Sequence, residues 1–293
     1  MLKTRLWMGA LLIGLAALLL FEEQWLGGWF PILFVATTAA CLLGTRELLS
    51  MLDPTSRPSA PLCYVGVLAI LIANWRAPLV AAGLLPPAVS VWHWIGLIAT
   101  ITGLAAFLVE MYRFKGPDRI VERVSQTVFI LFYLGILPSF LLQLRWVDPN
   151  STSGYPSRST LALALTVFVP KCGDIGAYFT GKFLTGGLLG RNHMTPRLSP
   201  KKTWQGLVGG LLACIFVAIA VHLMFAFVPG LIVAVAFGLT VGIAGVFGDL
   251  AESLIKRDRE TKDASAAIPG FGGILDVIDS LLFAAPVAYL WLA

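Results

Sequence analysis

Long apolar runs separated by short polar stretches cover most of this chain. Nine runs have, or approach, the length of a helix that crosses a bilayer, and they lie at residues 6–21, 28–44, 62–84, 91–109, 124–142, 159–180, 204–228, 231–248 and 274–292. The first is short, and the third is interrupted by Asn74 and Arg76. The pattern predicts an all-α polytopic membrane protein with about nine transmembrane helices.

Composition and charge support this prediction and add an orientation. Hydrophobic residues make up 58% of the chain and charged residues 13%, whereas about a quarter of the residues in soluble domains are charged. Of the 21 Lys and Arg residues, all but Arg76, Arg145 and Arg158 fall in the loops on the side of the N-terminus. Positive loops stay in the cytoplasm. We therefore expect an inner (cytoplasmic) membrane protein with its N-terminus cytoplasmic and its C-terminus outside.

Residues suited to catalysis or ligand binding gather in the second half of the chain. We predict N-terminal transmembrane helices, about five, over residues 1–158, and a C-terminal catalytic transmembrane region over residues 159–293. The catalytic region holds two polar segments, 171–203 and 249–279, which the charge pattern places on the cytoplasmic side. In the N-terminal part, snorkelling or local pairing at helix ends is sufficient to explain Arg46 and Glu47.

The segment 249–279 carries eleven charged side chains between two apolar runs. An ionised side chain held at the centre of a bilayer costs about 3 kcal/mol, so this segment must lie in water, at an interface or in a polar cavity. On a helix, one face would collect carboxylates together with an ammonium group, from Asp249, Glu252, Ser253 and Lys256.

A turn rich in Pro and Gly follows, and two further carboxylates follow the turn. The turn residues, which would end one helix and expose the N-terminus of the next to an anion, are Pro269, Gly270, Gly272 and Gly273. Asp276 and Asp279 then share a helix face. Oxygen ligands select Mg²⁺-type ions, and Lys and Arg neutralise phosphate. The pattern indicates metal-assisted transfer of a phosphoryl or nucleotidyl group.

The segment 171–203 is predicted to face the same side of the membrane and so to build the same site. Asp174 and Tyr178 lie four residues apart at a helix end, and Lys201 and Lys202 precede Thr203 where the next apolar run begins. Two adjacent ammonium groups at a lipid surface suit a nucleoside triphosphate or an anionic lipid headgroup.

Both segments resemble the phosphatidate cytidylyltransferase (CDP-diacylglycerol synthase) family. In the segment 249–279 the resemblance is carried by Ser253, Lys256, Arg257, Lys262, Asp263, Pro269, Gly270, Gly272, Gly273, Asp276 and Asp279. In the segment 171–203 it is carried by Asp174, Ala177, Tyr178, Gly181, Ser199, Pro200, Lys201, Lys202 and Thr203. The departures are Phe271, Val277 and Gln205, where the family usually has His, Arg and Glu.

The resemblance implies a reaction and a set of roles. CTP and phosphatidic acid would give CDP-diacylglycerol and pyrophosphate, with Mg²⁺ as cofactor, K⁺ as a candidate monovalent cation, a homodimer as the assembly and no nucleic acid as partner. Asp249 and Asp276 are expected to bind the metal, and Asp279 to bind it or support a ligand. The expected phosphate contacts are Lys201, Lys202, Lys256, Arg257 and Lys262. The remaining expected substrate-binding residues are Ser199, Thr203, Asp174, Tyr178, Ser253, Asp263, Gly272 and Gly273.

Two other classes of function stay open at this point. A CTP-dependent kinase of a polyprenol or another lipid would use similar phosphate chemistry, and it would release CDP instead of pyrophosphate. An ion-coupled transporter would use intramembrane charges as a pathway. The gathering of charges at one membrane face disfavours the transporter.

Overall fold

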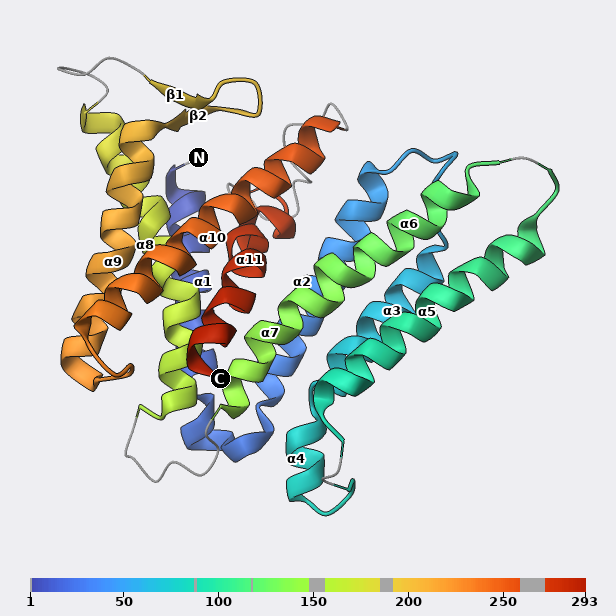
Figure 1. Ribbon diagram of the computed structural model, residues 1–293, viewed down its shortest axis with the longest axis horizontal. Coiled ribbons are helices and arrows are strands. Elements are labelled where there is room, and N and C mark those ends of the chain that lie inside the picture. The colour runs from blue at the N-terminus through green and yellow to red at the C-terminus, as the bar shows by residue number, and fades with distance from the viewer. Residues whose placement is uncertain (1, 87–88, 117, 148–155, 185–191, 259–271) are drawn as a thin grey trace. The chain divides into compact units, whose positions relative to one another are not determined.

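The computed structural model describes residues 2–86, 89–116, 118–147, 156–184, 192–258 and 272–293, which are almost entirely helical (Figure 1). Eight helices among these residues are long and apolar enough to cross a membrane, which confirms the prediction of an all-α polytopic membrane protein. The chain packs into two compact units. The first holds residues 1–142 and 263–275, and the second holds residues 143–262 and 276–293.

The described part of the first unit consists mainly of helices. They are α1 (Leu2–Leu26), η1 (Gly27–Trp29), α2 (Pro31–Met51), α3 (Ala60–Ala73), α4 (Arg76–Ala81), α5 (Val91–Arg113), α6 (Ile120–Leu131), the π-helical turn η2 (Phe132–Ile136) and most of α7 (Leu137–Gln143). A carboxylate from α1 holds the start of α2: the buried Glu22 accepts hydrogen bonds from the backbone N–H groups of Ile32 and, at 3.0 Å, Leu33.

The third apolar run of the sequence differs from the prediction because it is divided. The helix α3 has 14 residues, fewer than the roughly 20 that span a bilayer, and α4 begins after a break at Asn74. The buried Asn74 amide donates to the carbonyl oxygen of Ile70 at 2.9 Å and to Ser139 Oγ at 2.8 Å. A polar side chain that finds partners inside the protein can therefore interrupt an apolar run at little cost.

The second unit contains the four helices that carry the polar segments. They are α8 (Arg158–Leu184), α9 (Trp204–Phe225), α10 (Leu231–Asp258) and α11 (Ile274–Leu292), preceded by η3 (Leu144–Trp146); the first two residues of α11 group with the first unit. Close contacts at glycine join α8, α9 and α10. A Cβ at Gly209 would overlap Thr180, and one at Gly238 would lie 2.8 Å from the carbonyl oxygen of Cys214. Small residues let these helices pack with their backbones close together.

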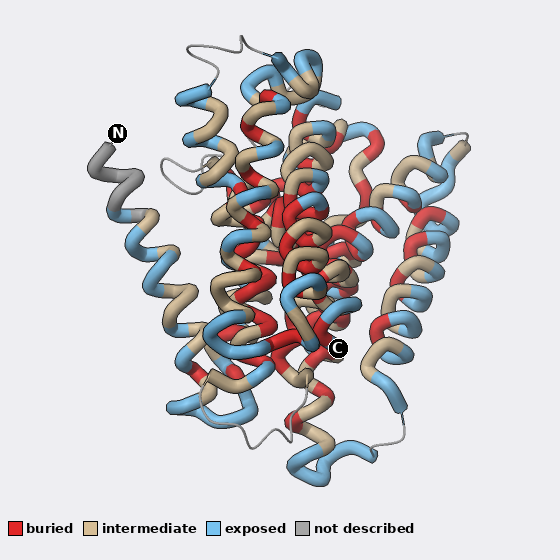
Figure 2. Tube along the Cα trace, turned by 60° about the vertical axis from the view of Figure 1, so that its left-hand side comes forward, coloured by how far each residue is buried: buried red, intermediate tan, exposed pale blue. Residues whose placement is uncertain are grey.

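Burial is uneven along the chain (Figure 2). Only 6% of the residues in the apolar part of α1 are buried, whereas the second unit has a continuous core around Val169, Ala218, Phe237 and Val241. Apolar side chains on the outside of the helices, such as Phe216 and Ile232, suit contact with lipid. The protein is therefore a multi-span membrane protein, and the helices of its second unit pack around a continuous buried core.

A small sheet interrupts the helices. The strands β1 (His193–Thr195) and β2 (Ser199–Thr203) pair antiparallel, with His193 opposite Thr203 and Thr195 opposite Ser199. The strand β2 runs directly into α9, where the Thr203 side chain accepts a hydrogen bond from the backbone N–H of Gly206 at 3.1 Å. This cap fixes the junction between the hairpin and the helix.

The boundary predicted at residue 158 separates the chain by function, and the packing of the two units does not test it. The predicted orientation of the termini likewise stays a prediction.

Candidate active site

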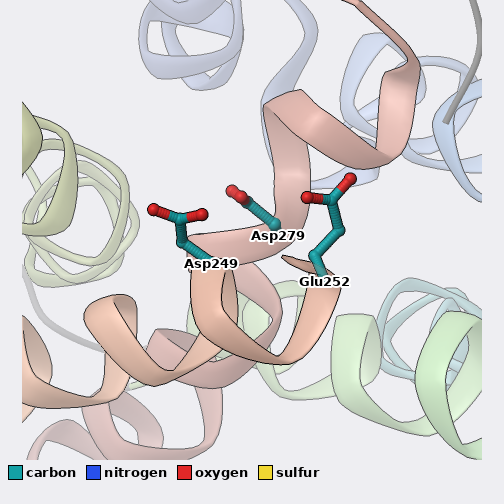
Figure 3. Close-up of side chains that lie close together, drawn as sticks. All are labelled: Asp249, Glu252 and Asp279. Atoms are coloured by element: carbon teal, nitrogen blue, oxygen red, sulfur yellow. The ribbon is translucent and has the colours of Figure 1, made fainter. Parts of the chain in front are cut away.

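Three carboxylates from two helices converge in the second unit (Figure 3). Asp249 and Glu252 project from α10, and Asp279 projects from α11; each offers an oxygen atom within 4.8 Å of the other two. Glu252 and Asp279 are buried, and Asp249 is one-third exposed. We call these three residues the acidic trio. Spacing of i, i+3 brings the first two to one face of α10, as expected for a helix.

Gly248 explains how α11 comes close enough to complete the trio. A Cβ at this position would collide with the backbone carbonyl oxygen of Asp279 and would lie 2.9 Å from Ser280 Cα. Only glycine permits this approach of the two backbones. The residue next to Asp249 thus sets the separation between α10 and α11, and through it the separation of the carboxylates.

Each member of the trio also faces a lysine. Lys202 Nζ lies 2.6 Å from Asp249 Oδ2, Lys256 Nζ lies 2.5 Å from Glu252 Oε2, and Lys171 Nζ lies 3.8 Å from Asp279 Oδ1. Lysines from α8, β2 and α10 therefore surround the carboxylates and offset part of their mutual repulsion.

The second carboxylate oxygen of Glu252, Oε1, does not share the ion pair with Lys256. Glu252 Oε1 is buried and has no hydrogen-bond partner among the described residues. A buried carboxylate oxygen without a partner is costly, so its environment is suited to a cation.

A cavity of about 800 Å³ adjoins the trio at Asp249, between α8, the hairpin, α9 and α10. This volume lies within the usual range of about 300–1,000 Å³ for small-molecule sites. Its lining is basic as well as acidic, with side chains from Lys182, His193, Lys201, Lys202, Asp174 and Asp249. Such a cavity can hold an anionic molecule of nucleotide size beside the carboxylates.

Several predicted substrate-binding residues line this cavity. Ser199 and Thr203 reach it from β2, although Thr203 also caps α9. Tyr178 reaches it from α8, and its ring centroid lies 5.8 Å from Lys182 Nζ. The structure therefore places Asp174, Tyr178, Ser199 and the two lysines of β2 around one cavity with Asp249.

The remaining predicted residues lie elsewhere or are not described. Asp276 accepts a hydrogen bond from Lys256 Nζ at 2.6 Å and lies outside the trio, so its role as a metal ligand stays a prediction. Arg257 Nε donates to the carbonyl oxygen of Leu198 at 3.4 Å, which links the end of α10 to the hairpin. Ser253 is half-buried on α10, and Gly272 and Gly273 precede α11. Lys262 and Asp263 lie outside the described residues.

Two residues of this site were assigned no binding or catalytic role from the sequence. The sequence placed Glu252 on the same helix face as Asp249, but it predicted that Asp249, Asp276 and Asp279 bind the metal. Lys171 contacts both Asp279 and, at 3.8 Å, Asp174. The signal for Lys171 is a charged residue within an apolar helix, which by default indicates a functional position.

Comparison with known sequences identifies the family of this chain. The sequence model of the Cytidylyltransferase family matches residues 3–293. The chain belongs to the cytidylyltransferase family. Members that resemble it include "Phosphatidate cytidylyltransferase 4, chloroplastic" of Arabidopsis thaliana, which is 33% identical over 278 residues, 90% of this chain and 67% of the plant protein.

Bacterial members of the cytidylyltransferase family match over most of their own length. A phosphatidate cytidylyltransferase of Synechocystis sp. is 31% identical over 300 residues, 94% of this chain and 92% of that protein. One from Thermotoga maritima is 29% identical over 235 residues, 67% of this chain and 86% of that protein. The family match spans both units of the fold, including the helices without site residues.

Proposed function

We propose that this protein transfers the cytidylyl group of CTP to phosphatidic acid, giving CDP-diacylglycerol and pyrophosphate. The observation that carries the proposal is the acidic trio beside a lysine-lined cavity, in a chain of the cytidylyltransferase family whose relatives are named phosphatidate cytidylyltransferases. A lipid substrate agrees with a site carried by bilayer-length helices.

The donor set fits Mg²⁺. Asp249, Glu252 and Asp279 offer only oxygen ligands, which Mg²⁺ prefers. The ion-paired cluster around them contains five carboxylates and three ammonium groups, and so carries two formal negative charges; its members are Asp174, Asp249, Glu252, Asp276, Asp279, Lys171, Lys202 and Lys256. When bound, Mg²⁺ would supply positive charge to the phosphate oxygens of the substrate. K⁺ as a second cation and a homodimer stay predictions from the family resemblance.

The basic side chains of the cavity would bind the triphosphate. Lys201 and Lys202 lie at the mouth of α9 and line the cavity, and Lys202 would place the phosphates next to Asp249. Lys256 bridges Glu252 and Asp276, and so joins α10 to α11. By fixing the carboxylates before the substrate arrives, these ion pairs lower the reorganisation that the reaction requires.

The bond changes need no side-chain nucleophile. An oxygen of the phosphatidic acid phosphate attacks the α-phosphorus of CTP, and the bond from that phosphorus to the oxygen of the β-phosphate breaks. Pyrophosphate leaves with the bonding electrons. The chain contributes by alignment and by stabilising charge on the leaving group through its lysines.

We further propose that the site faces the cytoplasm at the inner membrane. This proposal is supported by the distribution of Lys and Arg among the loops and by the source of CTP, which is a cytoplasmic nucleotide. The cavity then opens on the side from which the water-soluble substrate arrives.

Product analysis tests the proposed function. Purified protein in detergent is incubated with CTP labelled in the cytosine, phosphatidic acid and Mg²⁺, and lipid and water-soluble products are separated. We expect a labelled CDP-lipid and an equal amount of pyrophosphate, and neither product in excess EDTA. Release of CDP with a phosphorylated lipid would identify a CTP-dependent kinase, and equal turnover in EDTA would refute the metal assignment.

A further inference from the structure

A carboxylate from a distant part of the chain holds the first turn of α11. Glu47 lies in α2, and its Oε1 accepts a hydrogen bond from the backbone N–H of Ile274 at 2.9 Å. Its Oε2 accepts one from the backbone N–H of Leu275 at 3.0 Å. These three residues belong to the same compact unit. Glu47 is 5% exposed, so water does not compete effectively for these bonds.

The Glu47 carboxylate supplies hydrogen-bond acceptors for the first backbone N–H groups of α11. The first backbone N–H groups of a helix have no partner within the helix and need an acceptor. Gly273, which precedes α11, has no side chain with which to cap it. A carboxylate satisfies two of these donors at once and interacts favourably with the positive end of the helix dipole.

The side chain next to this cap is fixed as well. Gly44 precedes Glu47 by about one turn of α2, and a Cβ on Gly44 would lie 3.1 Å from Leu275 Cδ2. Leu275 is 1% exposed. The face of α2 that holds the backbone of α11 therefore also seats its first buried side chain, and together the two contacts set both the start and the rotation of α11.

Rotation of α11 matters because the helix carries site residues immediately afterwards. Asp276 follows Leu275 directly, and Asp279 comes four residues after Leu275. Each residue of a helix turns by about 100° and rises about 1.5 Å. A shift of the start by one residue would turn Asp279 away from Asp249.

We propose that Glu47 is a positioning residue, which orients Asp276 and Asp279 by fixing the first turn of α11. Its effect on the rate of catalysis rests on the proposed function, whereas its effect on α11 does not. Glu47 was expected from the sequence to be explained by snorkelling or local pairing, and its hydrogen bonds to residues 227 and 228 positions away replace that interpretation.

The chain offers a matched control in Glu22. This carboxylate is fully buried and caps the start of α2 through the N–H groups of Ile32 and Leu33. It makes the same kind of contact at the N-terminal end of α2, whose other end carries Glu47, so a general loosening of α2 would affect both variants alike. Glu22→Gln and Glu47→Gln each keep the size of the side chain while replacing one accepting carboxylate oxygen by an amide NH2 group, which only donates.

Hydrogen exchange tests the structural part of the proposal in the full-length protein in detergent. Amide exchange of peptides that begin at the start of α11 is followed by mass spectrometry in the wild type and both variants. We expect Glu47→Gln to accelerate exchange in the first turn of α11 at least about tenfold, and Glu22→Gln to leave it unchanged. Unchanged exchange in Glu47→Gln would overturn the proposal.

Kinetics tests the consequence for the site. We expect Glu47→Gln to lower kcat at least about tenfold with a smaller change in the KM for CTP, because binding groups outside α11 are kept. Glu22→Gln should retain kcat within about twofold. Equal losses in both variants would indicate general destabilisation and overturn the positioning role.

A replacement variant and the wild-type activity assay keep misfolding, the positioning role and the proposed function distinguishable. If Glu47→Gln does not elute from gel filtration as folded protein, Glu47→Asp replaces it, because the shorter side chain keeps the charge but cannot reach both backbone N–H groups of α11; normal exchange in α11 and normal kcat in that variant would overturn the proposal. A wild-type protein that forms no CDP-lipid would refute the proposed function alone, since the exchange experiment still decides whether Glu47 fixes α11.

Discussion

Gly248→Ala should disable the site although it replaces none of the charged residues. The added Cβ would lie 2.9 Å from Ser280 Cα and closer still to the Asp279 carbonyl oxygen, whereas carbon atoms pack at about 3.5–4.0 Å. The backbones of α10 and α11 must therefore separate by about 0.6 Å or more. Overpacking of this kind costs about 1–3 kcal/mol of stability.

The separation acts directly on the acidic trio, because Asp249 and Glu252 move with α10 and Asp279 with α11. A misplacement on the order of 1 Å can reduce a rate by about 100-fold, so we expect kcat for CDP-lipid formation to fall by about 10- to 100-fold. The assay is pyrophosphate release by detergent-purified protein at saturating CTP. Folding is verified by gel filtration and thermal unfolding.

Gly96→Ala provides the control for this experiment. Gly96 lies in α5, and a Cβ there would meet nothing within 4 Å, so the substitution adds the same methyl group to a helix without strain. We expect unchanged kcat and slightly higher stability, because Ala favours a helix over Gly by about 1 kcal/mol. A kcat for folded Gly248→Ala within twofold of the wild type would show that the spacing of α10 and α11 does not place the carboxylates.

Three further predictions concern the trio, the cavity and the membrane orientation. Glu252→Gln should reduce kcat at least about 100-fold and more than Asp276→Asn does, since Glu252 belongs to the trio and Asp276 pairs with Lys256; the reverse order in the pyrophosphate assay would return the metal-binding role to Asp276. Lys202→Ala should lower kcat/KM for CTP by about 10- to 100-fold, and an unchanged value would remove Lys202 from the phosphate site. In a background lacking the four native Cys residues, Ser90→Cys should be labelled in intact cells by an impermeant maleimide and Lys115→Cys only after permeabilisation; the opposite labelling would invert the predicted orientation.

Local patterns made the helices predictable, because a run of apolar residues that satisfies its own backbone has few alternatives in a bilayer. The exception, the run 62–84, failed for a non-local reason: Asn74 finds a partner in Ser139, 65 residues away. The sequence could not show whether a polar residue in an apolar run would be satisfied inside the protein.

The candidate site was likewise predictable where it depends on local motifs, and not where it depends on the packing of distant segments. Asp249 and the basic residues of β2 lie in recognisable motifs, and the structure places them around one cavity. The choice between Glu252 and Asp276 depends on how α10 and α11 pack against each other, and the close approach at Gly248 that brings the two helices together is a non-local contact. The contact of Glu47 with the first turn of α11 could not be predicted either, because no short-range pattern links α2 to the start of α11.

The sparse packing of α1 has a consequence for the behaviour of the protein in different membranes. Few residues of its apolar part are buried, and Glu22, near its C-terminal end, joins it to α2. A helix that is sparsely packed along its apolar part can change its tilt to match the hydrocarbon thickness around it. Thicker or thinner bilayers would then be accommodated by α1 pivoting at Glu22, while the helices that carry the carboxylates keep their geometry.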